Sequence, residues 1–265
     1  AYAPIEWRDV EIDFNGPAQT SGHGIVIQSP GTVGFYGTCP VFSGVRMLNA
    51  KENTFVTETG RNMMRLYDCR LNSGGSGHAV LIRGAMDSKI DRCYIGEHYS
   101  GVGVNFESGS GLQVTNTHIY SNDINFQKNE NAKDVRFALC DFDRAERYGV
   151  VLYGNNNPLY NHNVVLRDCT FVYNSKQAGS AGIYSDIFVR GPVKLTVDGG
   201  NIPYFGAGVH ESVTKHFIEF SSWNGNDAVP ANVQELHFDP ASANALWVGG
   251  FTNDFTKIVG RWQRW

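Results

Sequence analysis

Apolar and polar residues follow one eight-residue frame that recurs along the chain. In the segment VVLRDCTF, which starts at Val164, apolar residues stand at the first, third and eighth positions and a cysteine at the sixth. Alternation with a period of two predicts a strand, a bend at two polar residues, and a second short strand that begins at the cysteine. The frame starts at Met64, Ser88, Leu112, Val135, Val164 and Leu195, and a weaker copy starts at Pro40.

The frames are nearly evenly spaced. Successive starts from Met64 to Leu195 are 24, 24, 23, 29 and 31 residues apart. An internal repeat of this length is typical of solenoid proteins. A third short strand is expected between frames, in the segments that begin at Val80, Val104, Ile124, Val150 and Ile187. Three strands joined by bends rich in Gly and Asn describe one turn, or rung, of a parallel β-helix.

Composition and charge support a β protein and exclude several partners. With 30 Gly, 12% aromatic and only 18% charged residues, the chain of 265 residues suits a turn-rich β fold. Its net charge of −4 leaves no basic surface for phosphates, so no nucleic-acid partner is expected. The apolar stretches are too short to cross a bilayer, so no membrane insertion is predicted.

The cysteines are explained by the repeat. Five cysteines form no C-x-x-C pair, and an odd number cannot close a disulfide framework. The sixth position of the frame is occupied by Cys69, Cys93, Thr117, Cys140 and Cys169, and the eighth by Leu71, Ile95, Ile119, Phe142 and Phe171. Both positions are expected to face inward, where a free thiol acts as a small hydrophobe. No metal and no cofactor is predicted.

The frame resembles the right-handed parallel β-helix of pectate-lyase-like proteins, in its alternation, its bend at Asn116 or Asp168 and its three-strand coil. The resemblance covers about residues 40–205. It implies an all-β protein, a single-stranded right-handed parallel β-helix. We expect one β-helix domain over residues 1–265, with N-terminal rungs or a cap in 1–39 and the last rungs and a C-terminal cap in 206–265. Trp262 and Trp265 are expected in that cap.

The coil alone says little about activity, because lyases, hydrolases, epimerases and viral tailspikes share it. The Gly/Asn-rich, weakly charged rungs most resemble bacteriophage tailspike or tail-fibre depolymerase domains. This resemblance implies binding, and cleavage, of a bacterial surface polysaccharide such as a capsule or lipopolysaccharide O-antigen. It also implies a homotrimer located outside the cell on the virion.

Function is expected on the outward positions of the third strand, where residues from successive rungs stack ~4.8 Å apart. Three outward columns are predicted: Ala79, Gly103, Asp123, Gly149 and Asp186; Leu81, Asn105, Asn125, Val151 and Phe188; Arg83, Glu107, Gln127, Tyr153 and Arg190. Acids, amides, Arg and aromatic rings together suit sugars. The predicted substrate-binding residues are Arg83, Asn105, Asn125, Gln127, Tyr153 and Arg190. Long loops at 154–162 and 173–185 flank this face.

A pair of carboxylates is the candidate for catalysis. Asp123 and Asp186 share a predicted column and should lie two rungs, ~10 Å, apart. Inverting glycosidases separate their acid and base by ~6.5–9.5 Å. Glu146 and Glu107 are candidates to assist. The alternatives are ordinary surface acids and ion pairs.

Two other functions remain open. The outward column of the second strand contains Arg70, Tyr94 and His118, a set that suits a polysaccharide lyase or epimerase. A β-helix that binds glycan without cleaving it, or has a purely structural role in a virion, is the other alternative.

Overall fold

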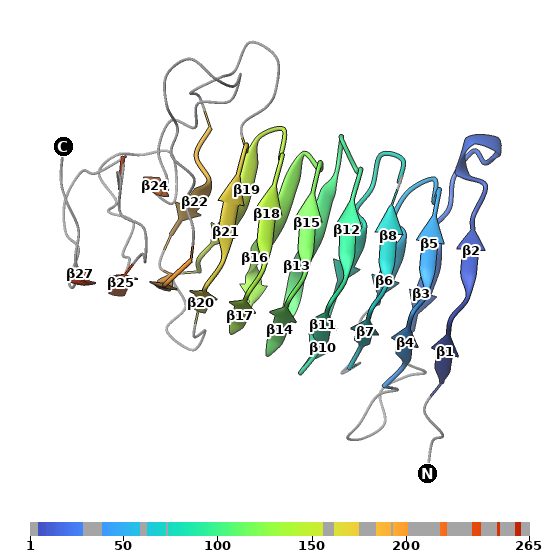
Figure 1. The fold of residues 1–265 in the computed structure, drawn as a ribbon, viewed down its shortest axis with the longest axis horizontal. Helices are drawn as coiled ribbons and strands as arrows, with labels where there is room; N and C mark the ends of the chain where they lie inside the picture. Colours follow the sequence, from blue (N-terminus) through green and yellow to red (C-terminus); the bar gives the residue numbers. More distant parts are fainter. Residues whose placement is uncertain are drawn as a thin grey trace.

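The chain forms a coil of three parallel sheets, described by a computed structural model for residues 5–28, 39–58, 63–72, 74–155, 162–174, 184–191 and 193–200 and for four later strands. From β1 to β22 each rung contributes one strand to each sheet, and every strand pair among the described residues is parallel. Figure 1 shows the rungs side by side from β1 at one end to β27 at the other. The fold is therefore the predicted right-handed parallel β-helix.

The first sheet contains the first half of every frame. Its strands are β1 (Glu6–Arg8), β4 (Val41–Ser43), β7 (Arg65–Tyr67), β11 (Lys89–Asp91), β14 (Leu112–Thr115), β17 (Val135–Ala138), β20 (Asn163–Arg167), β23 (Lys194–Asp198), β25 (Glu235–Asp239) and β27 (Ile258–Gly260). Leu112 pairs with Val135, Val135 with Val164, and Val164 with Leu195. The predicted alignment of the frames is confirmed.

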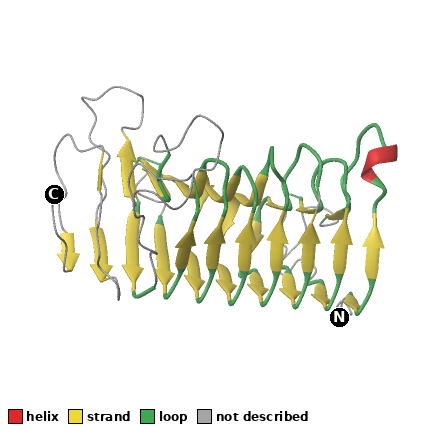
Figure 2. Cartoon of the chain, turned by 45° about the horizontal axis from the view of Figure 1, so that its top comes forward, coloured by secondary structure: helices red, strands yellow, loops and turns green. Residues whose placement is uncertain are grey.

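The second and third sheets complete each rung. The second contains β2 (Glu11–Asp13), β5 (Arg46–Leu48), β8 (Arg70–Asn72), β12 (Tyr94–Gly96), β15 (His118–Tyr120), β18 (Asp141–Asp143) and β21 (Thr170–Val172). The third contains β3 (Ile25–Ile27), β6 (Phe55–Thr57), β9 (Val80–Ile82), β13 (Val102–Ser110), β16 (Ile124–Ala132), β19 (Tyr148–Tyr153), β22 (Ile187–Arg190), β24 (Ile218–Ser221) and β26 (Val248–Gly249), with β10 (Ala85–Met86) beside β13. Figure 2 shows the one short 3-10 helix of the described residues, η1 (Gly16–Ala18), at the β2 end of the coil.

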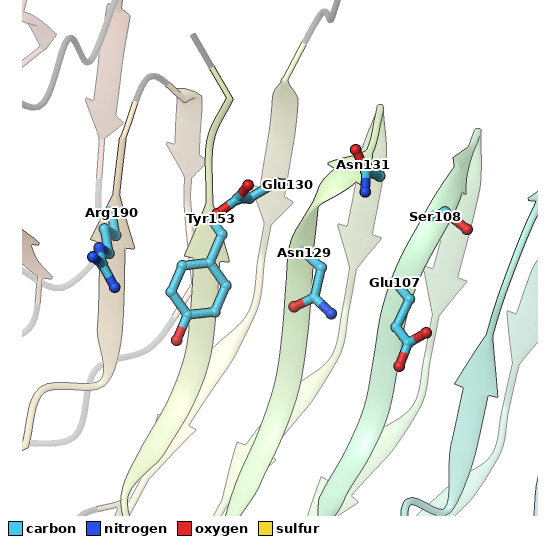
Figure 3. Close-up of a pocket in the computed structure, with 7 residues that line it drawn as sticks. All are labelled: Glu107, Ser108, Asn129, Glu130, Asn131, Tyr153 and Arg190. Carbon is cyan, nitrogen blue, oxygen red and sulfur yellow. The ribbon is translucent and has the colours of Figure 1, made fainter. Parts of the chain in front are cut away.

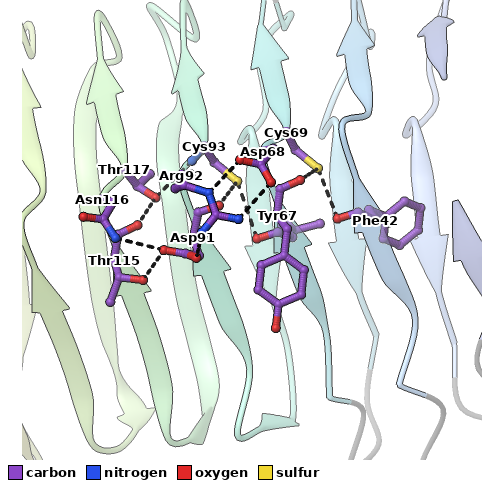
Figure 4. Close-up of polar contacts among 11 residues, drawn as sticks. Phe42, Tyr67, Asp68, Cys69, Asp91, Arg92, Cys93, Thr115, Asn116 and Thr117 are labelled. Carbon is purple, nitrogen blue, oxygen red and sulfur yellow. Dashed lines mark hydrogen bonds and ion pairs between the residues drawn. The ribbon is translucent and has the colours of Figure 1, made fainter. Parts of the chain in front are cut away.

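One left-handed residue makes the bend between the first and second strands of each rung. Successive rungs use Asp68, Arg92, Asn116, Leu139 and Asp168, all with φ between 49° and 55°. Asn, Asp and Gly tolerate this conformation best, which explains the polar bend in the frame. Figure 4 shows that the bends are also linked by side chains: the guanidinium of Arg92 donates to both carboxylate oxygens of Asp68, at 2.7 and 2.9 Å.

The residue after each bend starts the core. The thiols of Cys69 and Cys93 donate to the carbonyls of Tyr67 and Asp91, at 3.2 and 3.4 Å, and the Thr117 hydroxyl donates in the same way to Thr115 at 2.8 Å (Figure 4). All members of the predicted cysteine column and of the adjacent apolar column are buried. Burial of each large apolar side chain contributes ~1.5–3 kcal/mol. Cys69, Cys93, Cys140 and Cys169 are confirmed as core residues.

One predicted column is wrong in β16. Sequence similarity between VNF from Val104 and INF from Ile124 suggested that these strands align there, but Val104 pairs with Phe126. The corner before β16 is two residues shorter than the corner before β13, so the strand slides by two positions. Asn125, rather than Asp123, is therefore aligned with Gly149 and Asp186.

Candidate functional site

An open groove of about 500 Å³ lies on the outer face of the third sheet, at the ends of β13, β16, β19 and β22 (Figure 3). It is lined by Glu107, Ser108, Asn129, Glu130, Asn131, Tyr153 and Arg190. Tyr153 and Arg190 pair directly across β19 and β22. The groove therefore includes Glu107, Tyr153 and Arg190 of the predicted outward face, and the structure brings them together.

A β-bulge shapes the floor of the groove. Phe106 pairs with Lys128 and Ser108 with Asn131, so two steps along β13 match three steps along β16. A bulge of this kind redirects side chains and is common beside functional sites. It follows that Asn129 and Glu130 line the groove together, although they are adjacent in a strand. Gln127 donates its side-chain amide to Asn129 Oδ1 at 2.8 Å and holds that side chain.

Glu107 is fixed by ion pairs at one end of the groove. Arg83 donates from Nε to Glu107 Oε2 at 2.7 Å, and its Nη1 lies 3.4 Å from Glu58 Oε1. These side chains are about one third exposed, so the ion pairs orient the carboxylate and contribute little to stability. Arg83 itself does not line the groove. Arg83 thus orients Glu107, and its contact with a sugar stays a prediction.

An aromatic cluster lies beside the groove. The Tyr148 ring lies 5.0 Å from the ring of Tyr184 and 5.3 Å from that of Phe188, between centroids. Tyr153, Tyr148 and Phe188 also pack on the buried side chains of Val102, Ile124 and Val151. Burial raises the pKa of Tyr148 to about 12, so its hydroxyl keeps its proton at neutral pH. The cluster offers an apolar edge of the kind that packs on sugar rings.

The predicted Asp123–Asp186 acid pair is not formed. Both oxygens of Asp123 accept hydrogen bonds from Arg147, one of them at 2.7 Å from Nε. Asp186 faces the interior, is 0% exposed, and its Oδ1 accepts from Asn174 Nδ2 at 2.7 Å. The two aspartates also lie in different columns because of the shift in β16. Neither residue lines the groove, so the two aspartates do not form the paired site that was predicted.

Asn105 and Asn125 are also buried rather than exposed to ligand. Asn125 is 0% exposed; its amide donates to the carbonyl of Asp143 at 3.0 Å and its Oδ1 accepts from Asn122. Asn105 is 3% exposed, and its side-chain nitrogen lies 3.1 Å from His78 Nε2. Both predictions of an outward sugar contact are therefore wrong.

Glu146 lies in the corner before β19, half-buried. Its backbone N–H donates to the carbonyl of Asn122 at 2.8 Å, which fixes the corner. It does not line the groove, and the column shift removes the gap between Asp123 and Asp186 that it was expected to fill.

The second-sheet face holds the residues of the predicted lyase alternative. Arg70, Tyr94 and His118 are aligned on successive rungs, as expected. The structure adds Asp143, whose Oδ2 lies 3.3 Å from His118 Nε2. The His118 ring lies 5.9 Å from Tyr94 and 4.9 Å from Tyr120, between centroids. Asp143 was not among the predicted residues, although its position two residues after Asp141 in β18 places it on the same face.

Four residues that line the groove were not among the predicted site residues: Ser108, Asn129, Glu130 and Asn131. The signal was the polar run QKNENAK after Ile124, which is too polar for a regular half-buried strand. The bulge that brings these side chains outward depends on pairing between rungs and is not visible in one segment. The predicted loops at 154–162 and 173–185, and Trp262 and Trp265, lie largely or wholly outside the described residues.

Neither a metal site nor a membrane-spanning helix is found in the described part of the chain. No three His, Cys, Asp or Glu side chains gather there in a way that would hold an ion. No helix there has the length and apolar content needed to cross a bilayer.

Comparison with known proteins agrees with the coil geometry. Residues 9–191 match the family model described as right handed beta helix region, so the chain belongs to the right-handed β-helix family. Searches among curated proteins and among solved structures gave no significant match. The family fold is compatible with proteins that bind or degrade polysaccharides. A more specific function has to be argued from the residues of the groove.

Proposed function

We propose that this protein binds and depolymerises a bacterial surface polysaccharide, a capsule or lipopolysaccharide O-antigen, in the groove of the third sheet. The observation that carries the proposal is the lining of that groove, in which two carboxylates, two amides, Tyr153 and Arg190 meet on a rigid sheet. Amides and charged groups form paired hydrogen bonds with sugar hydroxyls, while the aromatic edge packs on C–H faces. An open groove admits a long chain.

Glu107 and Glu130 replace Asp123 and Asp186 as the proposed acid and base. Glycoside hydrolysis needs one carboxylic acid to protonate the leaving oxygen and one carboxylate to activate water or attack the sugar. Glu107 is held by Arg83, and Glu130 is exposed at the bulge on the next strand. Both line the same groove, which is the condition that the aspartates do not meet.

The test is release of reducing ends from a panel of bacterial capsule and lipopolysaccharide glycans. The parent protein is compared with Glu107→Gln and Glu130→Gln, and with Asp168→Asn, an exposed carboxylate on a bend away from the groove, as control. Release that falls by at least ~10²-fold in both glutamine variants, and is unchanged in the control, supports a hydrolase. Release that persists in both variants contradicts the proposed site. Binding without release by the parent would leave a non-enzymatic glycan-binding protein.

A polysaccharide lyase on the second sheet is the second candidate, favoured by the contact between His118 and Asp143. His118 would take the proton next to a uronate carboxylate; the electron pair forms a C=C bond, and the glycosidic C–O bond breaks with its oxygen taking a proton. Arg70 would neutralise the carboxylate and Tyr94 would contact the sugar. A product that absorbs in the near ultraviolet, and that disappears in His118→Asn but not in Glu107→Gln, identifies this reaction.

We further propose a homotrimer that acts outside the bacterial cell, as part of a phage tail. The support is the resemblance of the Gly/Asn-rich rungs to tailspike domains, together with a groove suited to a surface glycan. Sedimentation equilibrium tests the assembly: a mass three times that of the chain supports it, and a monomer at micromolar concentration contradicts it.

A further inference from the structure

A lysine and a histidine are buried together beneath the groove. Lys128 is 0% exposed, and its Nζ lies 2.9 Å from the carbonyl oxygen of Tyr153 and 3.3 Å from that of Asn129. These carbonyls belong to two residues that line the groove. The third neighbour of Nζ is Nδ1 of His162, at 2.8 Å. The amine therefore connects β16 and β19 at the bulge.

The contacts of His162 fix where its proton lies. The backbone N–H of Asn155 donates to Nε2 at 3.0 Å, so Nε2 is an acceptor. The carbonyl of Ala132 lies 3.2 Å from Nδ1 and needs a donor there. A neutral imidazole has one N–H, and both contacts place it on Nδ1.

This tautomer determines the state of the lysine. An N–H on Nδ1 points at Lys128 Nζ over 2.8 Å, and an ammonium group has no lone pair to accept it. A neutral amine does: it accepts from Nδ1 and donates its two N–H groups to Tyr153 and Asn129. The neutral pair is compatible with these five contacts, with the single N–H of Nδ1 shared between Nζ and the carbonyl of Ala132. A protonated Lys128 needs Nδ1 as acceptor, which moves the imidazole proton to Nε2 and opposes the contacts with Asn155 and Ala132.

We propose that Lys128 and His162 form an uncharged pair that positions the walls of the groove, and that uptake of one proton from solvent by this pair disrupts the groove. Lys128 is thus a positioning residue for the glycan site. Only the expected effect on glycan binding rests on the proposed function. When the proton arrives, the imidazole loses its bonds to Ala132 and Asn155. The backbone N–H of Asn155 then loses its acceptor on His162, while the ammonium group still donates to the carbonyls of Tyr153 and Asn129.

The surroundings favour the neutral state. Burial lowers the pKa of Lys128 to about 7, although Asp134 and Glu130 act in the opposite direction. Burial and the positive charge that Lys128 would carry lower the pKa of His162 to about 4, and Lys133 adds to this effect. The strand neighbours of Lys128, Phe106 and Leu152, are uncharged. The first proton is therefore expected on Lys128, near neutral pH.

The direct test needs no glycan. In protein labelled with ¹³C and ¹⁵N lysine, the Lys128 Nζ and Cε resonances are followed by NMR from about pH 5.5 to 9, and assigned by through-bond transfer to the backbone. We expect Lys128 to titrate near pH 7, while ordinary lysines stay protonated to about pH 10. The amide resonances of Asn129, Tyr153 and Asn155 should shift with the same midpoint. An Nζ that remains an ammonium group at pH 9 overturns the proposal.

Two variants separate positioning from general effects of pH. Lys128→Met keeps the length of the side chain but cannot bind a proton, so the shifts of Tyr153 and Asn155 should become independent of pH between about 6 and 8. Lys89→Met, in the first sheet, is the matched control and should keep the shifts of the parent. Equal pH dependence in Lys128→Met and the parent contradicts the proposal. If Lys128→Met does not fold, the titration of the parent protein still decides.

The consequence for function is measured with any glycan of the panel that binds. Affinity should fall about tenfold for each pH unit below the midpoint, since only the uncharged pair keeps the groove competent. In Lys128→Met this slope should disappear. Affinity that follows the same pH profile in both proteins contradicts the link to binding. Absence of glycan binding at every pH contradicts the proposed function, while the NMR titration tests the pair independently.

Discussion

Gly74 lies directly against the imidazole of His98, and a Cβ on Gly74 would fall 1.5 Å from Cε1 of that ring. His98 is 0% exposed, and it lies between the hydroxyl of Thr54 and the carbonyl of Gly77, each 3.3 Å from a ring nitrogen. The ring cannot move aside without losing these contacts. The absence of a side chain at Gly74 is therefore what allows a histidine inside the coil.

Gly74→Ala is expected to lower the free energy of unfolding by ~1–3 kcal/mol, the usual cost of overpacking a core. Urea denaturation of the parent and the variant measures it. The matched background is His98→Ala, which removes the ring: there, Gly74→Ala should cost less than ~1 kcal/mol, because the clash is gone. Equal costs in both backgrounds would show that the contact with His98 is not the cause.

Leu139 is the least suited of the bend residues. It is 59% exposed and has φ 55°, in the position that Asn116 occupies one rung earlier with φ 49°. A left-handed conformation costs an ordinary residue ~1–2 kcal/mol, and Asn tolerates it better. Leu139→Asn should therefore raise the free energy of unfolding by ~0.5–1 kcal/mol. The reverse exchange at a matched bend, Asp168→Leu, should lower it by a similar amount; a loss of stability in Leu139→Asn would contradict the argument.

The cysteines should differ sharply in reactivity. Cys69, Cys93, Cys140 and Cys169 are at most 4% exposed, whereas Cys39 is half-buried. Burial also raises the pKa of the Cys93 thiol. The hydrogen bond with Cys169, together with burial, raises the pKa of Cys140, and both shifts disfavour the reactive thiolate.

A thiol reagent added to the folded protein should therefore modify Cys39 first, and all five cysteines only in denaturant. Peptide mass spectrometry identifies the modified sites. Rapid native modification of Cys93 or Cys140 would contradict the placement of the cysteine column in the core.

The coil was predictable because its signal repeats. Each frame contributes a buried residue at the same positions, so that errors in one rung are corrected by the others, and Cys140 or Phe171 is placed by its equivalents. The bend shows the same logic, since Asp68, Asn116 and Asp168 are residue types that accept a left-handed backbone. The buried positions and the bend both depend on residue types that recur at the same position of each frame.

The site was only partly predictable because it is where the repeat breaks. A corner two residues shorter before β16 moved Asn125 inward and separated Asp123 from the column of Asp186. The bulge then inserted one residue and brought Asn129 and Glu130 to the surface. Tyr153 and Arg190 lie opposite each other as expected because β19 and β22 pair in the regular register. Glu107 lies as expected beside Arg83 because β13 pairs regularly with β9, on the side away from the bulge. A change in the length of one corner does not alter the apolar pattern of the strand that follows. The resulting shift in register is visible only in the pairing between strands.

The pH dependence of stability should report the two buried histidines. Burial lowers the pKa of His98 and of His162 to about 4, while in the unfolded chain each binds a proton near pH 6.5. Between these values the unfolded state holds more protons than the folded state. The free energy of unfolding must then fall as the pH is lowered through this window, by up to ~1.4 kcal/mol per pH unit for each histidine.

Urea denaturation between about pH 7 and 4.5 measures this slope, to which His98 and His162 should together contribute nearly two protons taken up on unfolding near pH 5.5. His78, whose pKa burial also lowers, adds to this uptake in the same direction. His98→Gln removes one titrating group and should reduce the uptake by about one proton relative to the parent. Carboxylates titrate mainly below this range, so they do not produce the same difference between variants. A slope that is unchanged in His98→Gln would mean that His98 is protonated inside the folded coil, and its placement between Thr54 and Gly77 would have to be revised.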